Sequence, residues 1–302
     1  MTTPSIENLL ESYDNPEITI IGPEVSIKIL SNHPCVVESI VLKKQIFSLI
    51  VQAVNLTNFD IFISFRSSLR TKLLSKLIKA KKKYQFNKRV YSTGHQVEKY
   101  NYFVNHIINK NTLPGNLILY SNSHTKKFSK KVVGINPGAS YGSAKRWTSD
   151  GFSELAFKLS KNYHVLIFGS INEIDLGLKI ENYLKENNIS NFENLCGKTT
   201  IDQLIHKIEA LDLFITGDSG PMHIAAAFKI PTISIFGPTK STETAQWKNT
   251  FSRIVTKNLD CQPCMKRACP LIHHNCMKLI TSEEVLEESV KLIRTVKVNQ
   301  MT

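Results

Sequence analysis

The residues best suited to chemistry stand together in the stretch 216–227, which reads TGDSGPMHIAAA. The apolar run 213–215 before it predicts a buried parallel strand, and Pro221 suits the first turn of a following helix. Unpaired backbone N–H groups and the positive dipole at such a helix start attract anions. With the Asp218 carboxylate and the His223 imidazole at its rim, the turn is suited to hold a diphosphate. The alternative is a plain strand–helix–strand unit with a turn of small residues.

A second loop with the same character spans 136–147 and reads NPGASYGSAKRW. It follows a predicted strand at 132–136, and its glycines and serines let backbone N–H groups approach a phosphate. Lys145 supplies a mobile positive charge for that phosphate. The alternative is an ordinary loop that anchors a buried Trp147.

A threonine pair and an arginine are weaker candidates. Thr199 or Thr200 is suited to cap a helix predicted at 201–210, which is a structural role. The stretch 67–71, SSLRT, follows a predicted strand. Arg70 in that stretch either meets an anionic ligand or lies solvated at the start of a helix.

Four of the six cysteines form a dense cluster toward the C-terminus, with the spacing C-x2-C-x4-C-x6-C. We call residues 261–277, which contain them, the cysteine loop. The candidate metal ligands are Cys261, Cys264, Cys269 and Cys276, with His273 and His274 beside them. The spacing permits a zinc site. The alternative is a structured loop of reduced cysteines, since a reducing cytoplasm disfavours disulfides.

Strand and helix patterns alternate along the chain, and this rhythm predicts mainly parallel sheets. In the first half, strands are expected at 18–21, 36–42, 60–65 and 89–91, and helices at 25–32, 69–79 and 96–109. In the second half, strands are expected at 132–136, 164–168 and 213–215, and helices at 150–161, 173–187, 201–210 and 283–298. A polar linker at 110–130 separates domains predicted at 1–115 and 128–302. Two doubly wound domains favour a ligand site in the cleft between them, at the carboxyl ends of the strands.

Composition and charge limit the class of protein. The 302 residues have room for two α/β domains, and 42% hydrophobic with 21% charged residues is typical of a soluble globular chain. No apolar run reaches the ~20 residues of a membrane span, and no secretory signal opens the chain, so a cytoplasmic location is expected. The net charge of +13 gathers in lysine clusters at 79–89 and 126–131, which form either a solvated surface or one that attracts polyanions. No known nucleic-acid-binding motif accompanies them, so nucleic acid is not expected as a partner.

The stretch 216–227, continued by IPTISIFGPT at 230–239, resembles the hallmark of glycosyltransferase family 9, the heptosyltransferases of the lipopolysaccharide inner core. The loop 136–147 and the cysteine loop resemble segments of the type II members. The resemblance implies a GT-B fold: two doubly wound Rossmann-like domains facing a cleft. It also implies donor contacts from the second domain, by Ser140, Lys145, Thr199, Asp218, Ser219, Gly220 and His223. Arg70 is then on the acceptor side, and no cofactor or metal is required.

The activity implied by the resemblance is transfer of heptose from ADP-L-glycero-D-manno-heptose to the heptose of the inner core, with inversion and without a metal. The acceptor would be lipid A–Kdo–heptose, met at the inner face of the inner membrane by a peripheral cytoplasmic enzyme. Three alternatives remain: another family member such as a type I heptosyltransferase, a catalytically dead nucleotide-sugar binder, and a nucleic-acid binder acting through the lysine clusters.

The start of the sequence departs from the family pattern. Members open with a strand and a G-D-x-V-M-x-x-P loop whose aspartate is the expected catalytic base, and Met1 to Asn8 match the part just after that G-D. The catalytic residue is therefore unassigned, because the expected aspartate lies upstream of Met1. Two explanations are open: a reading frame opened at an internal methionine, or a real truncation. We expect a sheet without its central first strand to expose two strand edges, and this chain alone to be poorly active and marginally folded.

Overall fold

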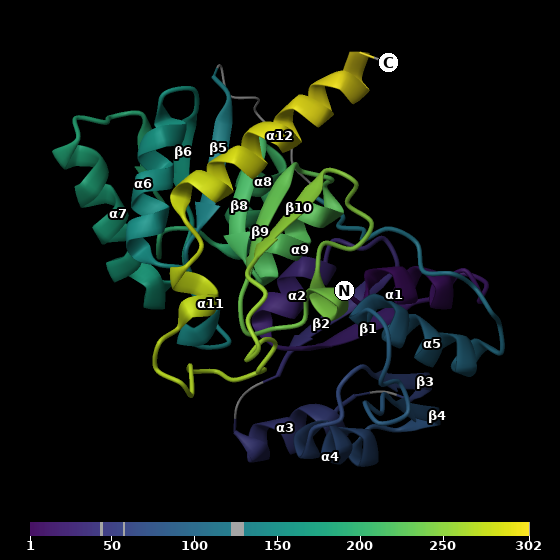
Figure 1. Cartoon of the computed structure of the whole chain (residues 1–302). Helices are drawn as coiled ribbons and strands as arrows, with labels where there is room; N and C mark the ends of the chain where they lie inside the picture. The colour runs from purple at the N-terminus through teal and green to yellow at the C-terminus, as the bar shows by residue number, and fades with distance from the viewer. Residues whose placement is uncertain (43–44, 57, 122–129, 302) are drawn as a thin grey trace. The chain divides into compact units, whose positions relative to one another are not determined.

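The computed structural model describes residues 1–42, 45–56, 58–121 and 130–301 (Figure 1). Its contacts divide the chain into two compact units, Met1–Tyr120 and Ser121–Thr302. We call them the N-terminal unit and the C-terminal unit and describe each by itself. The division falls within the stretch expected to be a linker, and part of the second lysine cluster, at 126–129, lies outside the described residues.

The N-terminal unit alternates short helices with parallel strands. Its helices are α1 (Thr3–Leu10), α2 (Glu24–Leu30), α3 (Ile46–Val54), α4 (Leu69–Leu77) and α5 (Gln96–Ile108). Its strands are β1 (Ile18–Gly22), β2 (Val36–Val41), β3 (Phe59–Ser64) and β4 (Ala80–Gln85). Strand β1 pairs in parallel with β2, and β3 pairs in parallel with β4. Among the described residues, β1 and β3 each have one strand neighbour.

One predicted strand of this unit is wrong. Residues 89–91 form turn and bend structure, and the strand lies earlier, at β4, where it includes part of the first lysine cluster. Lys81 on β4 and Asp60 on β3 form an exposed ion pair of 2.7 Å. The lysines therefore lie on β4, which pairs with β3. A prediction based on apolar residues does not detect this strand, because three of its residues are lysines.

The C-terminal unit contains a six-stranded parallel sheet. Its strands are β5 (Val132–Asn136), β6 (His164–Ile167), β7 (Phe192–Asn194), β8 (Leu213–Gly217), β9 (Thr232–Phe236) and β10 (Ser252–Thr256). Its helices are α6 (Ser149–Ser160), α7 (Ile174–Glu186), α8 (Ile201–Glu209), α9 (Gly220–Ala227), α10 (Ser241–Thr244), α11 (Asn275–Lys278) and α12 (Ser282–Met301), with short 3-10 helices η1 (Ser143–Lys145) and η2 (Ile171–Glu173). Among the described residues, no helix combines the length and apolarity needed to cross a membrane.

The strand order β10-β9-β8-β5-β6-β7 is that of a doubly wound sheet. The chain runs outward from β5 to β7 and then returns to β8 on the other side of β5. Figure 1 shows α12 in front of this sheet and α8 and α9 behind it. The chain leaves β5 toward one edge of the sheet and leaves β8 toward the other. In such sheets, the loops that follow these two neighbouring strands flank a crevice where ligands bind.

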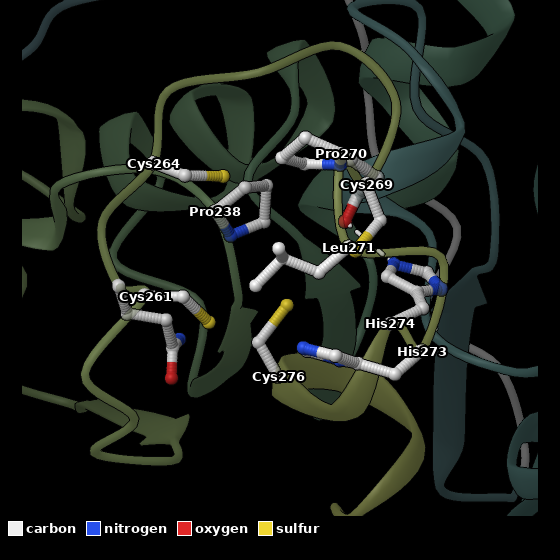
Figure 2. A pocket seen from close by; sticks show the side chains of 11 residues that line it. Pro238, Cys261, Cys264, Cys269, Pro270, Leu271, His273, His274 and Cys276 are labelled. Carbon is white, nitrogen blue, oxygen red and sulfur yellow. Dashed lines mark hydrogen bonds between the residues drawn. The ribbon is translucent and has the colours of Figure 1, made fainter.

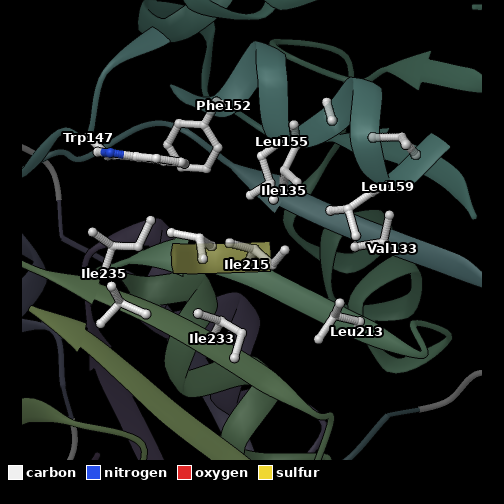
Figure 3. Close-up of a cluster of buried hydrophobic side chains, with 14 of the residues drawn as sticks. Val133, Ile135, Trp147, Phe152, Leu155, Leu159, Leu213, Ile215, Ile233 and Ile235 are labelled. Atoms are coloured by element: carbon white, nitrogen blue, oxygen red, sulfur yellow. The ribbon is translucent and has the colours of Figure 1, made fainter. Parts of the chain in front are cut away.

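The core of the C-terminal unit explains why these strands form. Every residue of β5, β8 and β9 is buried, which is the burial expected for central parallel strands. Figure 3 shows strand residues such as Ile135 and Ile215 packed against Leu155 of α6. Trp147 closes this core, with its ring edge-on to Phe152 at 4.8 Å and its indole N–H donating to the Ile280 carbonyl at 3.0 Å. The core thus fixes the end of the loop 136–147.

We predict that Ile215→Ala lowers the free energy of unfolding of the C-terminal unit by about 2–5 kcal/mol, because a fully buried side chain on β8 leaves a cavity. Leu178→Ala on α7, where the side chain is 43% exposed, is the matched control and should stay within about 0.5 kcal/mol of the wild type. Urea unfolding followed by circular dichroism measures both. Equal losses for the two variants would contradict this assignment of the core.

Candidate functional site

The polar residues of the C-terminal unit meet at the carboxyl ends of β5, β8 and β9. Lys145, from the loop after β5, pairs with Asp218, the first residue after β8, with 2.5 Å between Nζ and Oδ2. Their side chains are only 12% and 6% exposed. The Thr239 hydroxyl, three residues after β9, donates to the same carboxylate oxygen at 2.7 Å. One buried carboxylate therefore joins the loops that follow three neighbouring strands.

A second hydrogen-bond network joins the end of β5 to the end of β8 and the start of α9. The Asn136 side-chain amide at the end of β5 donates to Thr216 Oγ1 at 3.2 Å and to Ser219 Oγ at 3.3 Å. The hydroxyls of Thr216 and Ser219 are 2.9 Å apart. Ser219 is the N-cap residue of α9, yet its side chain makes no capping hydrogen bond. Because Pro221 has no backbone N–H, the first donors of α9 are those of Gly220 and Met222, and the Ser219 side chain does not cap them. Such uncapped helix starts bind an external acceptor at many phosphate sites.

Three of the predicted donor residues, Lys145, Asp218 and Ser219, are brought together by these contacts. Gly220 opens α9, and a Cβ added there would meet nothing within 4 Å, so space lies open over this turn. His223 is half-buried in α9. Lys145, Asp218 and Ser219 therefore lie together beside the start of α9, next to the open space at Gly220. Their contacts to a donor stay predictions.

The other predicted residues lie further from this cluster along the chain. Ser140 is exposed in the loop after β5, and Thr199 is half-buried just before α8. Thr200 is the N-cap of α8, where its hydroxyl accepts from the Gln203 backbone N–H, so the structural role belongs to Thr200. No contact in the described residues links Ser140 or Thr199 to the Lys145–Asp218 pair, and their donor contacts stay predictions.

Arg70 belongs to the N-terminal unit. It lies in the first turn of α4, whose N-cap Ser68 accepts from the Thr71 backbone N–H. Its Nε and Nη2 atoms are buried without a hydrogen-bond partner among the described residues. Arg70 is half-buried, and its two unused donor atoms suit a ligand better than they suit a solvated helix start.

Sequence reasoning missed a buried carboxylate at the same sheet edge. Glu173, after β6, is 6% exposed and accepts from the Ser170 backbone N–H at 2.7 Å and from its hydroxyl at 2.9 Å. A Cβ at Gly138 would lie 2.0 Å from this carboxyl group, so only glycine fits beside it. The sequence signal was the capping-box pattern S-x-x-E that follows the strand.

The cysteine loop surrounds a small cavity. Figure 2 shows Cys261, Cys264, Cys269 and Cys276 around it, with the Leu271 side chain among them. The cavity measures about 20 Å³, which is room for one water-sized body. Burial, and then the three other thiols, raise the pKa of Cys276 to about 11. In the part of the chain that the structure describes, no three His, Cys, Asp or Glu side chains are arranged to hold one metal ion.

The family model "Glycosyltransferase family 9 (heptosyltransferase)" matches residues 48–274. The chain belongs to this family.

Among its relatives are two proteins named lipooligosaccharide heptosyltransferase 2 from Campylobacter jejuni subsp. jejuni. The serotype O:2 protein is 37% identical over 304 residues, and the serotype O:6 protein is 39% identical over 302 residues. Each alignment covers 97% of this chain and 94% of the relative. This likeness extends over nearly the whole sequence.

Two solved structures show the fold. ADP-heptose LPS heptosyltransferase II of E. coli matches with a TM-score of 0.78 and 23% identity, over 98% of this chain and 95% of that one. A family 9 glycosyl transferase from Veillonella parvula matches with a TM-score of 0.82 and 19% identity, over 97% and 93%. The predicted α/β GT-B fold is confirmed.

We predict that Cys276 reacts slowly with iodoacetamide at about pH 8. A pKa raised from 9.0 to about 11 lowers the thiolate fraction about 100-fold at that pH. Cys35, half-buried in the N-terminal unit, is the internal reference and should react faster. Peptide mass spectrometry of the labelled chain gives both rates. Equal rates at Cys276 and Cys35 would contradict the burial described for the cysteine loop.

Proposed function

We propose that this protein transfers heptose from ADP-L-glycero-D-manno-heptose to the heptose of the lipopolysaccharide inner core. The observation that carries the proposal is the cluster of Lys145, Asp218 and Thr239 beside the uncapped start of α9. The sugar and the acceptor are inferred from the relatives, which match nearly the full length of this family 9 chain and are named heptosyltransferase 2. The enzyme is expected to work without a cofactor.

The reaction is a displacement at the anomeric carbon. The acceptor hydroxyl loses its proton to a base and attacks that carbon from the face opposite the diphosphate, so the configuration inverts. The bond to the diphosphate oxygen breaks, and ADP leaves with the electron pair. Negative charge therefore grows on the diphosphate in the transition state, and groups fixed around it lower the barrier most.

The C-terminal unit offers two such groups at one place. The start of α9 presents backbone N–H groups and a positive dipole, and its N-cap serine side chain is engaged elsewhere. Lys145 is held close to that start by Asp218, which follows β8. Because Lys145 is already oriented before the donor binds, little reorganisation is needed during the reaction. Together they stabilise the leaving ADP without a metal ion.

The N-terminal unit offers a basic pocket for the acceptor. A cavity of about 490 Å³ lies at the carboxyl ends of β3 and β4. It is lined by Ser67, Lys72, Gln85, Phe86, Asn87, Lys88 and Arg89. Three positive side chains in one pocket suit the negatively charged lipid A–Kdo–heptose acceptor, and the buried donors of Arg70 serve the same side. With a net charge of +13, the protein would work at the inner face of the inner membrane, as a peripheral cytoplasmic enzyme.

The first test measures ADP release. The purified protein is given ADP-heptose with heptose-bearing lipid A core, and in parallel ADP-heptose alone. We expect ADP to appear only when the acceptor is present, because transfer and not hydrolysis breaks the donor. Absence of both ADP release and ADP-heptose binding would overturn the proposed function, whereas binding without release would favour a catalytically dead nucleotide-sugar binder.

We further predict that Lys145→Gln lowers kcat by about 10²–10³, the usual effect of losing a group that stabilises transition-state charge. It should also lower stability by about 3–5 kcal/mol, because Asp218 is then a buried charge without its partner. The double variant Lys145→Gln/Asp218→Asn removes both charges and should regain stability but not kcat. Steady-state kinetics and urea unfolding separate the two effects.

The control for this pair of variants is Lys240→Gln. Lys240 forms a solvent-exposed ion pair with Glu243 at 3.4 Å, so its loss should leave both kcat and stability near the wild-type values. Recovery of kcat together with stability in the double variant would show that Lys145 has only a structural role.

A further inference from the structure

The cysteine loop is fastened to the loop that follows β5. The Ala144 backbone N–H donates to the Arg267 carbonyl at 3.0 Å, and the Tyr141 hydroxyl donates to the Met265 carbonyl at 3.0 Å. In return, Nε2 of His274 donates to the Ala144 carbonyl at 2.9 Å. Three hydrogen bonds thus tie a segment near the C-terminus to the loop that carries Lys145.

Close approach of the two loops depends on Gly142. A Cβ built on Gly142 would lie 2.3 Å from the Arg267 carbonyl oxygen, a separation that no side chain tolerates. Glycine at this position therefore lets the Arg267 backbone lie directly against the loop 136–147. The hydrogen bond from Ala144 therefore fixes the Arg267 backbone against the loop that carries Tyr141.

Tyr141 has two cations beside its ring. Nζ of Lys145 lies 4.7 Å from the ring centroid, and Cζ of Arg267 lies 5.2 Å from it. The charge of Lys145 is offset by Asp218. Arg267 is exposed and has no carboxylate within 4 Å among the described residues. A guanidinium without a carboxylate partner is thus held beside the same ring that Lys145 contacts.

We propose that Arg267 is a second phosphate-binding residue of the donor site, delivered to it by the cysteine loop. This inference rests on the proposed function and adds a residue to its donor site. The planar fork of an arginine binds two phosphate oxygens in a fixed bidentate geometry, whereas a lysine acts as a point charge. A diphosphate bound between Arg267 and Lys145 would give Arg267 the anionic partner that it lacks among the described residues. The cysteine loop then has a binding role that needs no metal ion.

The test compares Arg267→Ala with Lys266→Ala by isothermal titration calorimetry. Lys266 is the preceding residue and is also exposed. Lys266→Ala therefore removes one positive charge, as Arg267→Ala does, but leaves the contact between Arg267 and Tyr141 in place. We expect Arg267→Ala to weaken ADP binding about tenfold, and Arg267→Lys to lie between it and the wild type. Binding of adenosine, which has no phosphate, should not change in any variant. Circular dichroism melts check that each variant is folded.

Three outcomes decide the inference. Weaker ADP binding for Arg267→Ala, with Lys266→Ala like the wild type, supports it. Equal affinities for the two alanine variants, or a parallel loss of adenosine binding, overturn it and leave Arg267 as a structural residue of the loop. If the wild-type protein binds neither ADP nor ADP-heptose, the proposed function itself fails, and the inference fails with it.

Discussion

The site depends on one buried carboxylate. Asp218 is placed by β8 where solvent barely reaches it, and a charge so placed must be paired, because the cost of its desolvation is otherwise not recovered. Lys145 and Thr239 meet that demand from the loops after β5 and β9. One electrostatic requirement therefore fixes three loops, and it leaves the start of α9 open at the place where they converge.

Two further groups of contacts hold the loop that carries Lys145. Trp147, buried in the core, anchors the end of the loop that carries Lys145, and the cysteine loop holds the same segment from outside through Ala144. The loop is thus held through Trp147 at its end and through Ala144 by the Arg267 carbonyl and the His274 imidazole. In the proposed function, such support keeps Lys145 oriented before the diphosphate binds, and pre-oriented charge is more effective than charge that must rearrange.

The sheet of the C-terminal unit was predictable because its strands are continuous apolar runs, as at β5 and β8, followed by polar turns with helix-start signals. Strand β4 was missed because half of it is lysine, so an exposed strand resembled a charged surface cluster. Sequence patterns also proposed Lys145 and Asp218 separately, but their direct contact spans 73 positions of sequence and needs the sheet order. Arg267 carried no signal at all, since its place depends on how the cysteine loop folds back.

The most direct test of the account is the mass of the acceptor after reaction. Heptose-bearing lipid A core is incubated with ADP-heptose and the protein, and its mass spectrum is compared with that of a sample without protein. The account predicts that the acceptor gains the mass of one heptose residue as ADP forms. An unchanged acceptor beside free heptose and ADP, or beside intact ADP-heptose, would contradict the assignment of this protein as a heptosyltransferase.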